Sequence, residues 1–427
     1  MIKDKYKVTL IFIIIAAILI RTIYICKTNI SQLQFDVGIE SDYSATIDYE
    51  SLYENFDKGY NEGRHINYIM HLYTYMSLPT EIIGQFYHPP LHHFIMSITL
   101  KVMDVFSNSA SFKFESLQVV TLIYSIVILW ALYKILEELK IDNKNKIIPM
   151  MLFAFYPLYI YLSGSINNDE LVTMFALICL LYLIKWHKNP NIKNTLIIAI
   201  AMGLGLMTKS SMYVMLIPAV YVYFKTMIEF VNNDKKVGKL LFELIIFAII
   251  ASILGLWFQA KNMIEGQSTL GIIEPYEYLS IANESFLSRF GFSNPFEMSK
   301  VNVWNYLIYS SLNFGLILQS GWVIKLMVVI AITLILDSIY FMIKNFKEEK
   351  ILMISFITWW VFYFFLNFQM PYTCSMHSRY MLVPISIATI ILGKGMQEDE
   401  NKMLKIQVAV STISISIMSL FLFLFII

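Results

Sequence analysis

The chain has little charge. Asp, Glu, Lys and Arg make up 15% of its 427 residues, whereas hydrophobic residues make up 57%. Soluble globular proteins carry a larger charged fraction and a smaller apolar one, which excludes that class. The formal net charge is only +1, and a chain that binds nucleic acid through its bulk charge is strongly basic. No nucleic-acid partner is therefore expected.

Cysteine and phosphate-binding loops are also scarce. The three cysteines, Cys26, Cys179 and Cys374, are too few and too far apart for a disulfide framework or a metal-ligand spacing. No glycine-rich phosphate loop is present. The loops expected on the cytoplasmic side are also too short to hold a nucleotide-binding domain. These absences exclude the ATP-driven transporters.

Long apolar segments are what the chain does have. A membrane-spanning helix needs about 20 mostly apolar residues to cross roughly 30 Å of hydrocarbon. The sequence therefore predicts an all-α polytopic membrane protein, with a single transmembrane domain over residues 1–427 and about eleven transmembrane helices. They are 8–26, 117–136, 147–163, 171–186, 194–208, 211–231, 239–258, 321–343, 351–369, 379–393 and 405–427.

The first apolar segment follows Lys3, Lys5 and Lys7, the charge pattern of a secretory signal peptide. No small-residue cleavage site follows Ile25, and signal peptidase needs one. We therefore expect an uncleaved membrane anchor.

The basic residues predict the topology. Short, basic loops lie on the cytoplasmic side of membrane proteins. A cytoplasmic N-terminus puts most of the 32 Lys and Arg residues in such loops, which are 1–7, 134–146, 185–193, 225–239, 344–350 and 394–405. The prediction is a multi-pass plasma-membrane protein whose two long outer segments, 27–116 and 259–320, face outside.

This topology holds only if residues 88–106 do not cross the membrane. A crossing there would turn Lys140, Lys144 and Lys146 outward. The segment has one apolar stripe that includes Phe94 and Ile98, as expected of a helix lying on membrane lipid. We predict an interfacial or re-entrant helix at 88–106.

The most unusual stretch is Gln85–His93, with sequence Gln-Phe-Tyr-His-Pro-Pro-Leu-His-His. A diproline sets an extended approach and then tolerates the first turn of a helix. His88 and His92 have the i, i+4 spacing of a metal pair. Hydrogen bonding within a loop is the commoner role of such histidines, so no cofactor is predicted and a divalent metal stays an alternative.

Polar side chains able to do chemistry gather on the predicted outer side. A carboxylate can act as a general base toward a hydroxyl, and Lys, Arg and His can hold a phosphate leaving group. This set is suited to glycosyl transfer from a lipid phosphate. It comprises Asp36, His65, His88, His92, His93, Asn168, Asp169, Glu170, Lys209, Lys261, His377 and Arg379.

Each of these residues also has an ordinary structural role to weigh. Asp36 alone is a common loop acid, and Asn168 with Asp169 has the composition of a helix N-cap. Lys209 has the length to snorkel to the interface. Arg379 at the start of a helix is typical of an interfacial anchor.

Five motifs taken in order resemble the GT-C superfamily of membrane glycosyltransferases. The similarity is to the branch of the protein O-mannosyltransferases and the lipid A aminoarabinose transferases, and it runs over nearly the whole chain. The motifs are Phe35–Gly38, Gln85–His93, Ser163–Asp169, Met207–Lys209 and Ser378–Tyr380.

The resemblance implies a GT-C fold, a polyprenyl-phosphate sugar donor and inversion in one displacement. By position, Asp36 would be the catalytic base and Asp169 a second acid near the acceptor or the base. Residues that would bind the donor phosphate or substrate are His88, Lys209, Arg379, His65, His92, Lys261 and Glu170.

Two departures separate the chain from its relatives. Val37 follows Asp36 where the O-mannosyltransferases have an Asp-Glu pair, and Lys261-Asn262 stands where relatives often have Arg-Asn. The acceptor, whether lipid, glycan or protein, is left open.

Two other functions fit part of the pattern. A secondary transporter or flippase would also have many helices and intramembrane charge, yet transporters show repeated halves and midplane sites, and no internal repeat is visible here. A polysaccharide polymerase or ligase with a pyrophosphate-linked donor would share the chemistry but not the order of Asp36 and the diproline.

Overall fold

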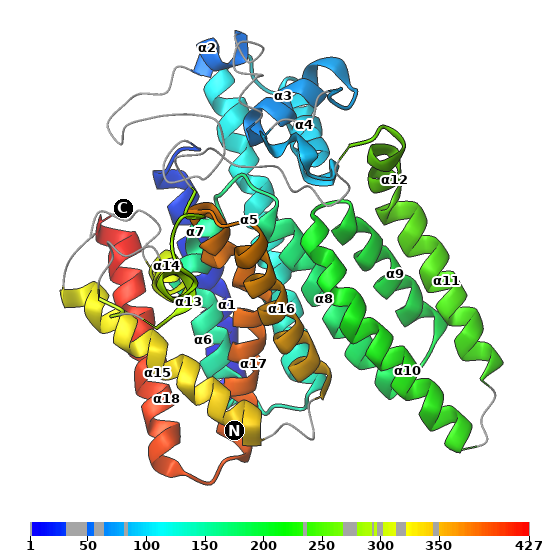
Figure 1. The fold of residues 1–427 in the computed structure, drawn as a ribbon. Coiled ribbons are helices and arrows are strands. Elements are labelled where there is room, and N and C mark those ends of the chain that lie inside the picture. Colours follow the sequence, from blue (N-terminus) through cyan, green and yellow to red (C-terminus); the bar gives the residue numbers. More distant parts are fainter. Residues whose placement is uncertain are drawn as a thin grey trace.

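The computed structural model describes residues 2–30, 49–54, 64–80, 84–233, 237–267, 280–292, 294–296, 302–312, 322–344 and 350–426. Within these ranges the regular structure is helical, apart from an isolated antiparallel bridge between Ser280 and Tyr372. The helices run mostly side by side in one bundle (Figure 1). The all-α prediction is confirmed.

Nine helical segments in the described ranges are long and apolar enough to cross a membrane. The protein is therefore a multi-pass membrane protein. The segments are α1 (Ile2–Lys27), α5 (Ala110–Glu138), α8 (Asp169–Lys188), η3 with α10 (Ser210–Met215, Leu216–Asn232), α11 (Gly238–Gly255), α15 (Trp322–Lys344), α16 (Lys350–Gln369), η5 and η6 with α17 (Thr373–Met376, Ser378–Met381, Leu382–Glu398), and α18 with η7 (Lys402–Phe421, Leu422–Ile426).

Two of the eleven predicted spans differ from these nine. Segment 147–163 is divided into α6 (Ile147–Phe155) and α7 (Pro157–Leu162), because Pro157 has no N–H to continue the first helix. Segment 194–208 forms the 15-residue helix α9 (Ile192–Leu206), shorter than a typical span. Both remain apolar and pack inside the bundle.

Short helices cover one end of the bundle, opposite the end where the chain begins (Figure 1). They are α2 (Tyr49–Glu54), α3 (His65–Tyr75), η2 (Gly84–Tyr87) and α4 (Leu91–Met103).

Helix α4 starts directly after Pro90 and has 13 residues. At 1.5 Å per residue it extends about 20 Å, less than the roughly 30 Å of a bilayer core. Phe94, Ile98 and Val102 are exposed along one side, while the other side packs on α3. This agrees with a helix that lies on the membrane.

The segment predicted to be the second long outer one contributes α12 (Trp257–Ile264), α13 (Phe286–Phe290) and α14 (Val303–Leu312). The Asn302 amide donates to the carbonyls of Ser288 and Gly291 and so joins α13 to the start of α14. Helix α14 packs against α7, α15 and η6. The segment thus reaches the loop that begins α17.

Close helix packing places the ends of α8 and α9 side by side. Gly203 and Gly255 let α9 and α11 approach, since a Cβ on Gly203 would lie 2.7 Å from Cβ of Leu254. Helix α9 also packs along α8, and α8 packs on α5. The start of α8 and the end of α9 meet at the site described next.

Candidate active site

Hydrogen bonds to two backbone carbonyls bring three of the sequence motifs together. The N–H of Leu91, at the start of α4, donates to the carbonyl of Met207 at 3.0 Å. The side-chain Nδ2 of Asn168 donates to the carbonyl of Thr208 at 3.3 Å. The diproline motif, the loop before α8 and the turn after α9 therefore share one site.

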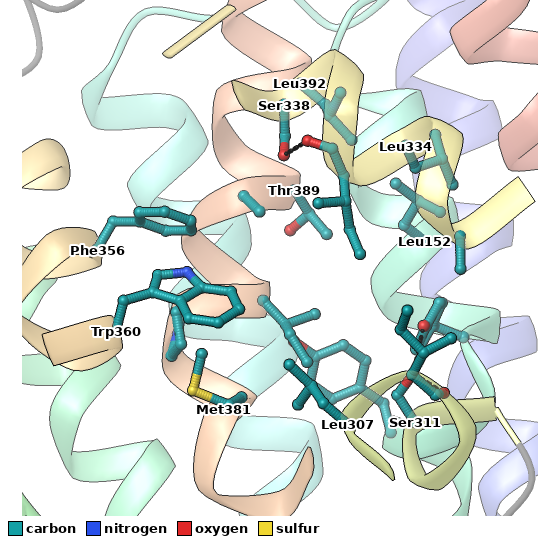
Figure 2. A pocket seen from close by; sticks show the side chains of 18 residues that line it. Leu152, Leu307, Ser311, Leu334, Ser338, Phe356, Trp360, Met381, Thr389 and Leu392 are labelled. Carbon is teal, nitrogen blue, oxygen red and sulfur yellow. Dashed lines mark hydrogen bonds between the residues drawn. The ribbon is translucent and has the colours of Figure 1, made fainter. Parts of the chain in front are cut away.

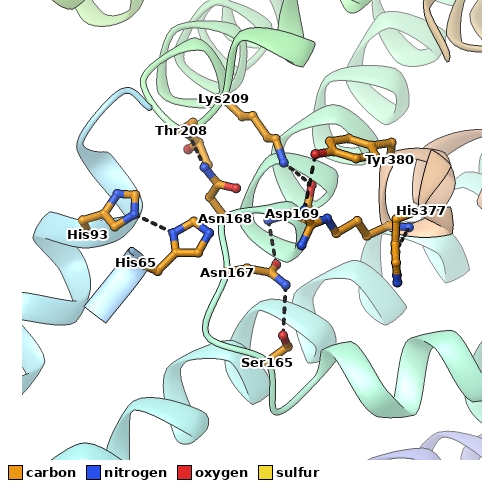
Figure 3. Close-up of polar contacts among 11 residues, drawn as sticks. His65, His93, Ser165, Asn167, Asn168, Asp169, Thr208, Lys209, His377 and Tyr380 are labelled. Atoms are coloured by element: carbon orange, nitrogen blue, oxygen red, sulfur yellow. Dashed lines mark hydrogen bonds and ion pairs between the residues drawn. The ribbon is translucent and has the colours of Figure 1, made fainter. Parts of the chain in front are cut away.

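Asp169 occupies the centre of this site as the first residue of α8 (Figure 3). Its Oδ1 accepts from Lys209 Nζ at 2.5 Å, and its Oδ2 lies 3.6 Å from Arg379 Nε. Asn167 helps to fix the turn, since its Oδ1 accepts from the Asp169 N–H at 3.0 Å. Two cations from distant parts of the chain thus converge on one carboxylate.

These contacts decide between the roles weighed for the cations. The side chains of Lys209 and Asp169 are only 8% and 4% exposed, so Lys209 pairs inside the protein and does not snorkel outward. Arg379 is likewise buried. Asn168 is the N-cap residue of α8, but its side chain makes no cap hydrogen bond.

Tyr380 packs against both cations. Lys209 Nζ lies 4.6 Å from the ring centroid, and Arg379 Cζ lies 5.2 Å from it. Cations are attracted to the face of an aromatic ring within about 6 Å. From the sequence, Tyr380 was only part of a motif. An aromatic residue directly after Arg379 was the signal that could have pointed to this contact.

Four histidines form a cluster beside these cations, from α3, α4 and the segment before α4. Nδ1 of His65 lies 2.8 Å from Nε2 of His93 (Figure 3). The ring of His65 is parallel to that of His88, with centroids 5.9 Å apart, and lies 6.4 Å from His92. Tyr68 stacks on His93 at 4.2 Å. The predicted residues His65, His88 and His92 are therefore brought together.

Burial lowers the pKa of every histidine in the cluster. For His88 and His92 the charge of Lys209 lowers it further, and the pKa of His92 falls to about 3. Burial followed by the neighbouring imidazoles lowers the pKa of His65 and His93. The cluster is therefore neutral at pH 7 and offers N–H donors without adding charge.

Metal binding has no support in the described part of the chain. No group of three or more His, Cys, Asp or Glu residues there is arranged to hold a metal ion. The imidazoles stack on one another, and a hydrogen bond joins His65 on α3 to His93 on α4, whereas neither ring nitrogen of His92 has a hydrogen-bond partner within the described residues.

Glu170 is fully buried next to Asp169, and neither of its carboxylate oxygens has a hydrogen-bond partner within the described residues. It interacts electrostatically with Arg21 of α1 and with Asp169. Arg21 is also fully buried. Arg21 was not among the candidate site residues from the sequence, although an arginine inside the first apolar segment is unusual.

Lys261 is not part of this constellation. It lies on α12 and pairs with Glu265 at 2.5 Å, four residues along the same helix and partly exposed. Asp36, the predicted base, lies outside the described residues. Among the described residues, the ion-pair centre consists of Asp169, Lys209 and Arg379.

An apolar cavity of about 110 Å³ lies between α6, α7, α14, α15, α16 and α17 (Figure 2). Met381, two residues after Arg379, lines it. The other lining residues are almost all apolar and include Trp360, Phe356 and Leu334. The cavity suits hydrocarbon and not a polar ligand.

Residues 87–258 match the family described as Dolichyl-phosphate-mannose-protein mannosyltransferase. Over this stretch the chain is similar to that glycosyltransferase family. The matched residues include His88, Asp169 and Lys209 and end before Arg379. The resemblance predicted from the motifs is confirmed for this part of the chain.

No curated protein matches the chain significantly. Among solved structures it is similar to the apo oligosaccharyltransferase of Archaeoglobus fulgidus, with 11% identity and a TM-score of 0.49 over 96% of this chain and 56% of that one. It is also similar to AglB of the same organism in complex with an inhibitory peptide and a dolichol-phosphate. The identity is 11% and the TM-score 0.47, over 97% of this chain and 56% of that one. The chain thus spans about half the length of these proteins.

Proposed function

We propose that the protein is a membrane glycosyltransferase that moves a sugar from a polyprenyl-phosphate donor to an acceptor at the outer face. The observation that carries this proposal is the convergence of Lys209 and Arg379 on the single carboxylate of Asp169. Lys and Arg donate charge-assisted hydrogen bonds to phosphate oxygens, so two converging cations favour a phosphate. The glycosyltransferase family of residues 87–258 supports the same chemistry.

The donor phosphate would bind to the two cations that Asp169 now holds. Lys209 and Arg379 are already buried and oriented, so little side-chain entropy is lost when a phosphate joins them. The neutral imidazole of His88 would add an N–H donor without repelling Lys209. In this proposal Asp169 keeps the cations in place and orients them toward the donor.

Part of the donor's lipid chain would enter this apolar cavity. Met381 lines the cavity and follows Arg379 by two residues, so a donor with its phosphate on Arg379 would have its first isoprene units near this lining. An isoprenoid chain has the apolar surface that this lining favours. A water-soluble nucleotide sugar has no such part.

The transfer itself needs one base and one stabilised leaving group. The acceptor oxygen would attack the anomeric carbon and form the new C–O bond as the bond to the phosphate oxygen breaks, which inverts the carbon. Asp36 would take the acceptor proton, and Lys209 and Arg379 would stabilise the released phosphate. The role of Asp36 rests on the sequence motif alone.

The orientation and acceptor belong to the same proposal. The basic loops 134–146 and 185–193 would face the cytoplasm, which puts Asp169 and the histidine cluster outside. The acceptor would be a hydroxyl-bearing lipid, glycan or protein there. Lys261, within the second outer segment, would contact substrate only after leaving Glu265.

A transfer assay tests this function. Purified protein in detergent is given a radiolabelled polyprenyl-phosphate sugar and candidate acceptors, and the released polyprenyl phosphate is measured. We expect release that Asp36→Asn abolishes and that Asp142→Asn, in a predicted inner loop, leaves unchanged. Transport of the intact donor across vesicles without release would instead show a flippase, and release unaffected by Asp36→Asn would refute the assigned base.

A further inference from the structure

Arg21 is a charged residue in the middle of the first membrane helix, yet its side chain is only 1% exposed. Charged groups inside membrane helices are costly and are found paired with other groups or with backbone carbonyls. The hydrogen bonds of Arg21 therefore identify the acceptor groups that its guanidinium satisfies.

The break between α6 and α7 creates carbonyls that need a donor. In a continuous helix the carbonyl of Phe153 would accept from residue 157, but Pro157 has no N–H. Tyr156 is extended, with ψ 132°, and its N–H satisfies only the carbonyl of Leu152. The carbonyls of Phe153 and Ala154 end the helix without partners from their own helix.

Arg21 supplies those partners. Its Nη2 donates to the carbonyl of Phe153 at 2.9 Å, and its Nη1 donates to that of Ala154 at 2.7 Å. Its Nε donates to Ser125 Oγ at 3.0 Å on α5. The planar fork of a guanidinium can reach two neighbouring carbonyls at once. A neighbouring helix thus re-satisfies the backbone groups freed by a proline.

The same face of α5 also holds the loop that follows α7. Thr121, one turn before Ser125, donates to the carbonyl of Ser163 at 2.8 Å. Between the break and this contact lies α7, whose six residues are all buried. The loop continues through Asn167 to Asp169. The path from the break to Asp169 is short and is fixed at both ends.

We propose that Arg21 is a positioning residue: by joining the interrupted end of α6 to α5, it fixes α7 and the Ser163–Asn168 loop and so places Asp169 against Lys209 and Arg379. The catalytic part of this proposal rests on the proposed function. Its structural part does not, because it concerns only where the loop is held. Glu170, the buried neighbour of Asp169, is the acidic group that the charge of Arg21 acts on.

Hydrogen exchange of the full-length protein in nanodiscs tests the structural part. Arg21→Lys keeps the charge but loses the fork, and we expect faster exchange in residues 158–168 and no change in residues 175–185 of α8. Arg21→Met should give a larger change in the same residues. Exchange that is unchanged at 158–168, or equally faster in both regions, would overturn the proposal.

A second arginine serves as the matched control. Arg289 is also buried and donates to a backbone carbonyl, that of Asn367 at 2.5 Å, but it lies on α13. Arg289→Met removes the same kind of contact elsewhere, and exchange at 158–168 should stay as in the wild type. Faster exchange there in this variant would show a general loss of stability and contradict a local role of Arg21.

A kinetic cycle tests the catalytic part. If Arg21 acts through Asp169, Arg21→Lys should lower kcat about tenfold in the wild type but less than about threefold in an Asp169→Asn background. If Arg21→Lys lowers kcat by the same factor in both backgrounds, the two residues act independently. A wild-type protein without transfer activity would refute the proposed function, while the exchange experiment would still decide whether Arg21 fixes the loop.

Discussion

Lys209 and Asp169 form a buried ion pair with 2.5 Å between Nζ and Oδ1 across 40 positions of sequence. Each partner is held by its own helix end, Asp169 by the start of α8 and Lys209 by the turn after α9. Arg379 approaches the other carboxylate oxygen. The site is thus built from three helix termini that only packing brings together.

Replacing Lys209 should weaken donor binding more than it changes chemistry. Lys209→Met removes one charge-assisted hydrogen bond to the phosphate, worth about 1.5–3 kcal/mol, so the KM for the donor should rise roughly ten- to a hundredfold. Lys101→Met, an exposed lysine on α4, is the control and should leave KM unchanged. An unaltered donor KM in Lys209→Met would rule out the phosphate role.

Thermal stability should test the ion pair independently of the transfer activity. Asp169→Asn leaves the buried charges of Lys209 and Arg379 without this carboxylate, and a buried charge that loses its partner is destabilising. The double variant Lys209→Met/Asp169→Asn removes one of the two cations as well. We expect its thermal midpoint to lie above that of Asp169→Asn alone, and a further decrease would contradict this account.

Tyr380 should matter through its ring. Cation–π contacts contribute about 0.5–2 kcal/mol, so Tyr380→Leu should lower kcat/KM about 2- to 30-fold by loosening Lys209 and Arg379. Tyr380→Phe keeps the ring and should stay close to the wild type. The comparison needs only steady-state kinetics, and equal losses in both variants would point to the hydroxyl instead.

The histidine cluster should make the protein acid-sensitive. Its pKa values are lowered in the folded state, so below pH 6.5 the unfolded chain binds more protons and stability falls. The loss is about 1.4 kcal/mol per pH unit for each histidine, and for His92 it continues to about pH 3. Above about pH 7.5 these histidines are neutral in the folded and the unfolded state, so they should no longer change the free energy of unfolding with pH.

Thermal unfolding between pH 5 and pH 8 checks this dependence. His92→Gln removes one titrating group and should flatten the decline below pH 6.5. Thr99→Val, also on α4, removes no titrating group and is the control. The same slope in His92→Gln and in the wild type would mean that the cluster does not titrate as described.

The α9–α11 contact should not tolerate a methyl group. A Cβ on Gly203 would lie 2.7 Å from Cβ of Leu254 and 3.2 Å from the carbonyl of Ala251, and overpacking of this kind costs about 1–3 kcal/mol. Gly203→Ala should therefore unfold at a lower temperature. Gly238→Ala is the control and should be neutral or slightly stabilising, since nothing lies within 4 Å of the added Cβ. Equal thermal midpoints of Gly203→Ala and the wild type would show that the helices adjust to the methyl group.

The apolar runs and the diproline were enough to predict the membrane helices and α4. Nine of the eleven predicted spans coincide with long helices, because each run of about 20 apolar residues must satisfy its backbone internally. The break at Pro157 was readable from proline chemistry. Its partner was not, since Arg21 lies 132 and 133 positions from the carbonyls that it caps.

The fold class and the residue types available for chemistry follow from the sequence alone, because hydrophobicity and proline act locally. Asp169, Lys209, Arg379 and the four clustered histidines were candidates from the sequence as well. Their partners are seen only in the folded protein, where Lys209 and Arg379 meet Asp169, Lys261 pairs with Glu265, Tyr380 packs on both cations and Arg21 binds the carbonyls of Phe153 and Ala154. Such pairings depend on how helix ends meet in the bundle, which local sequence does not encode.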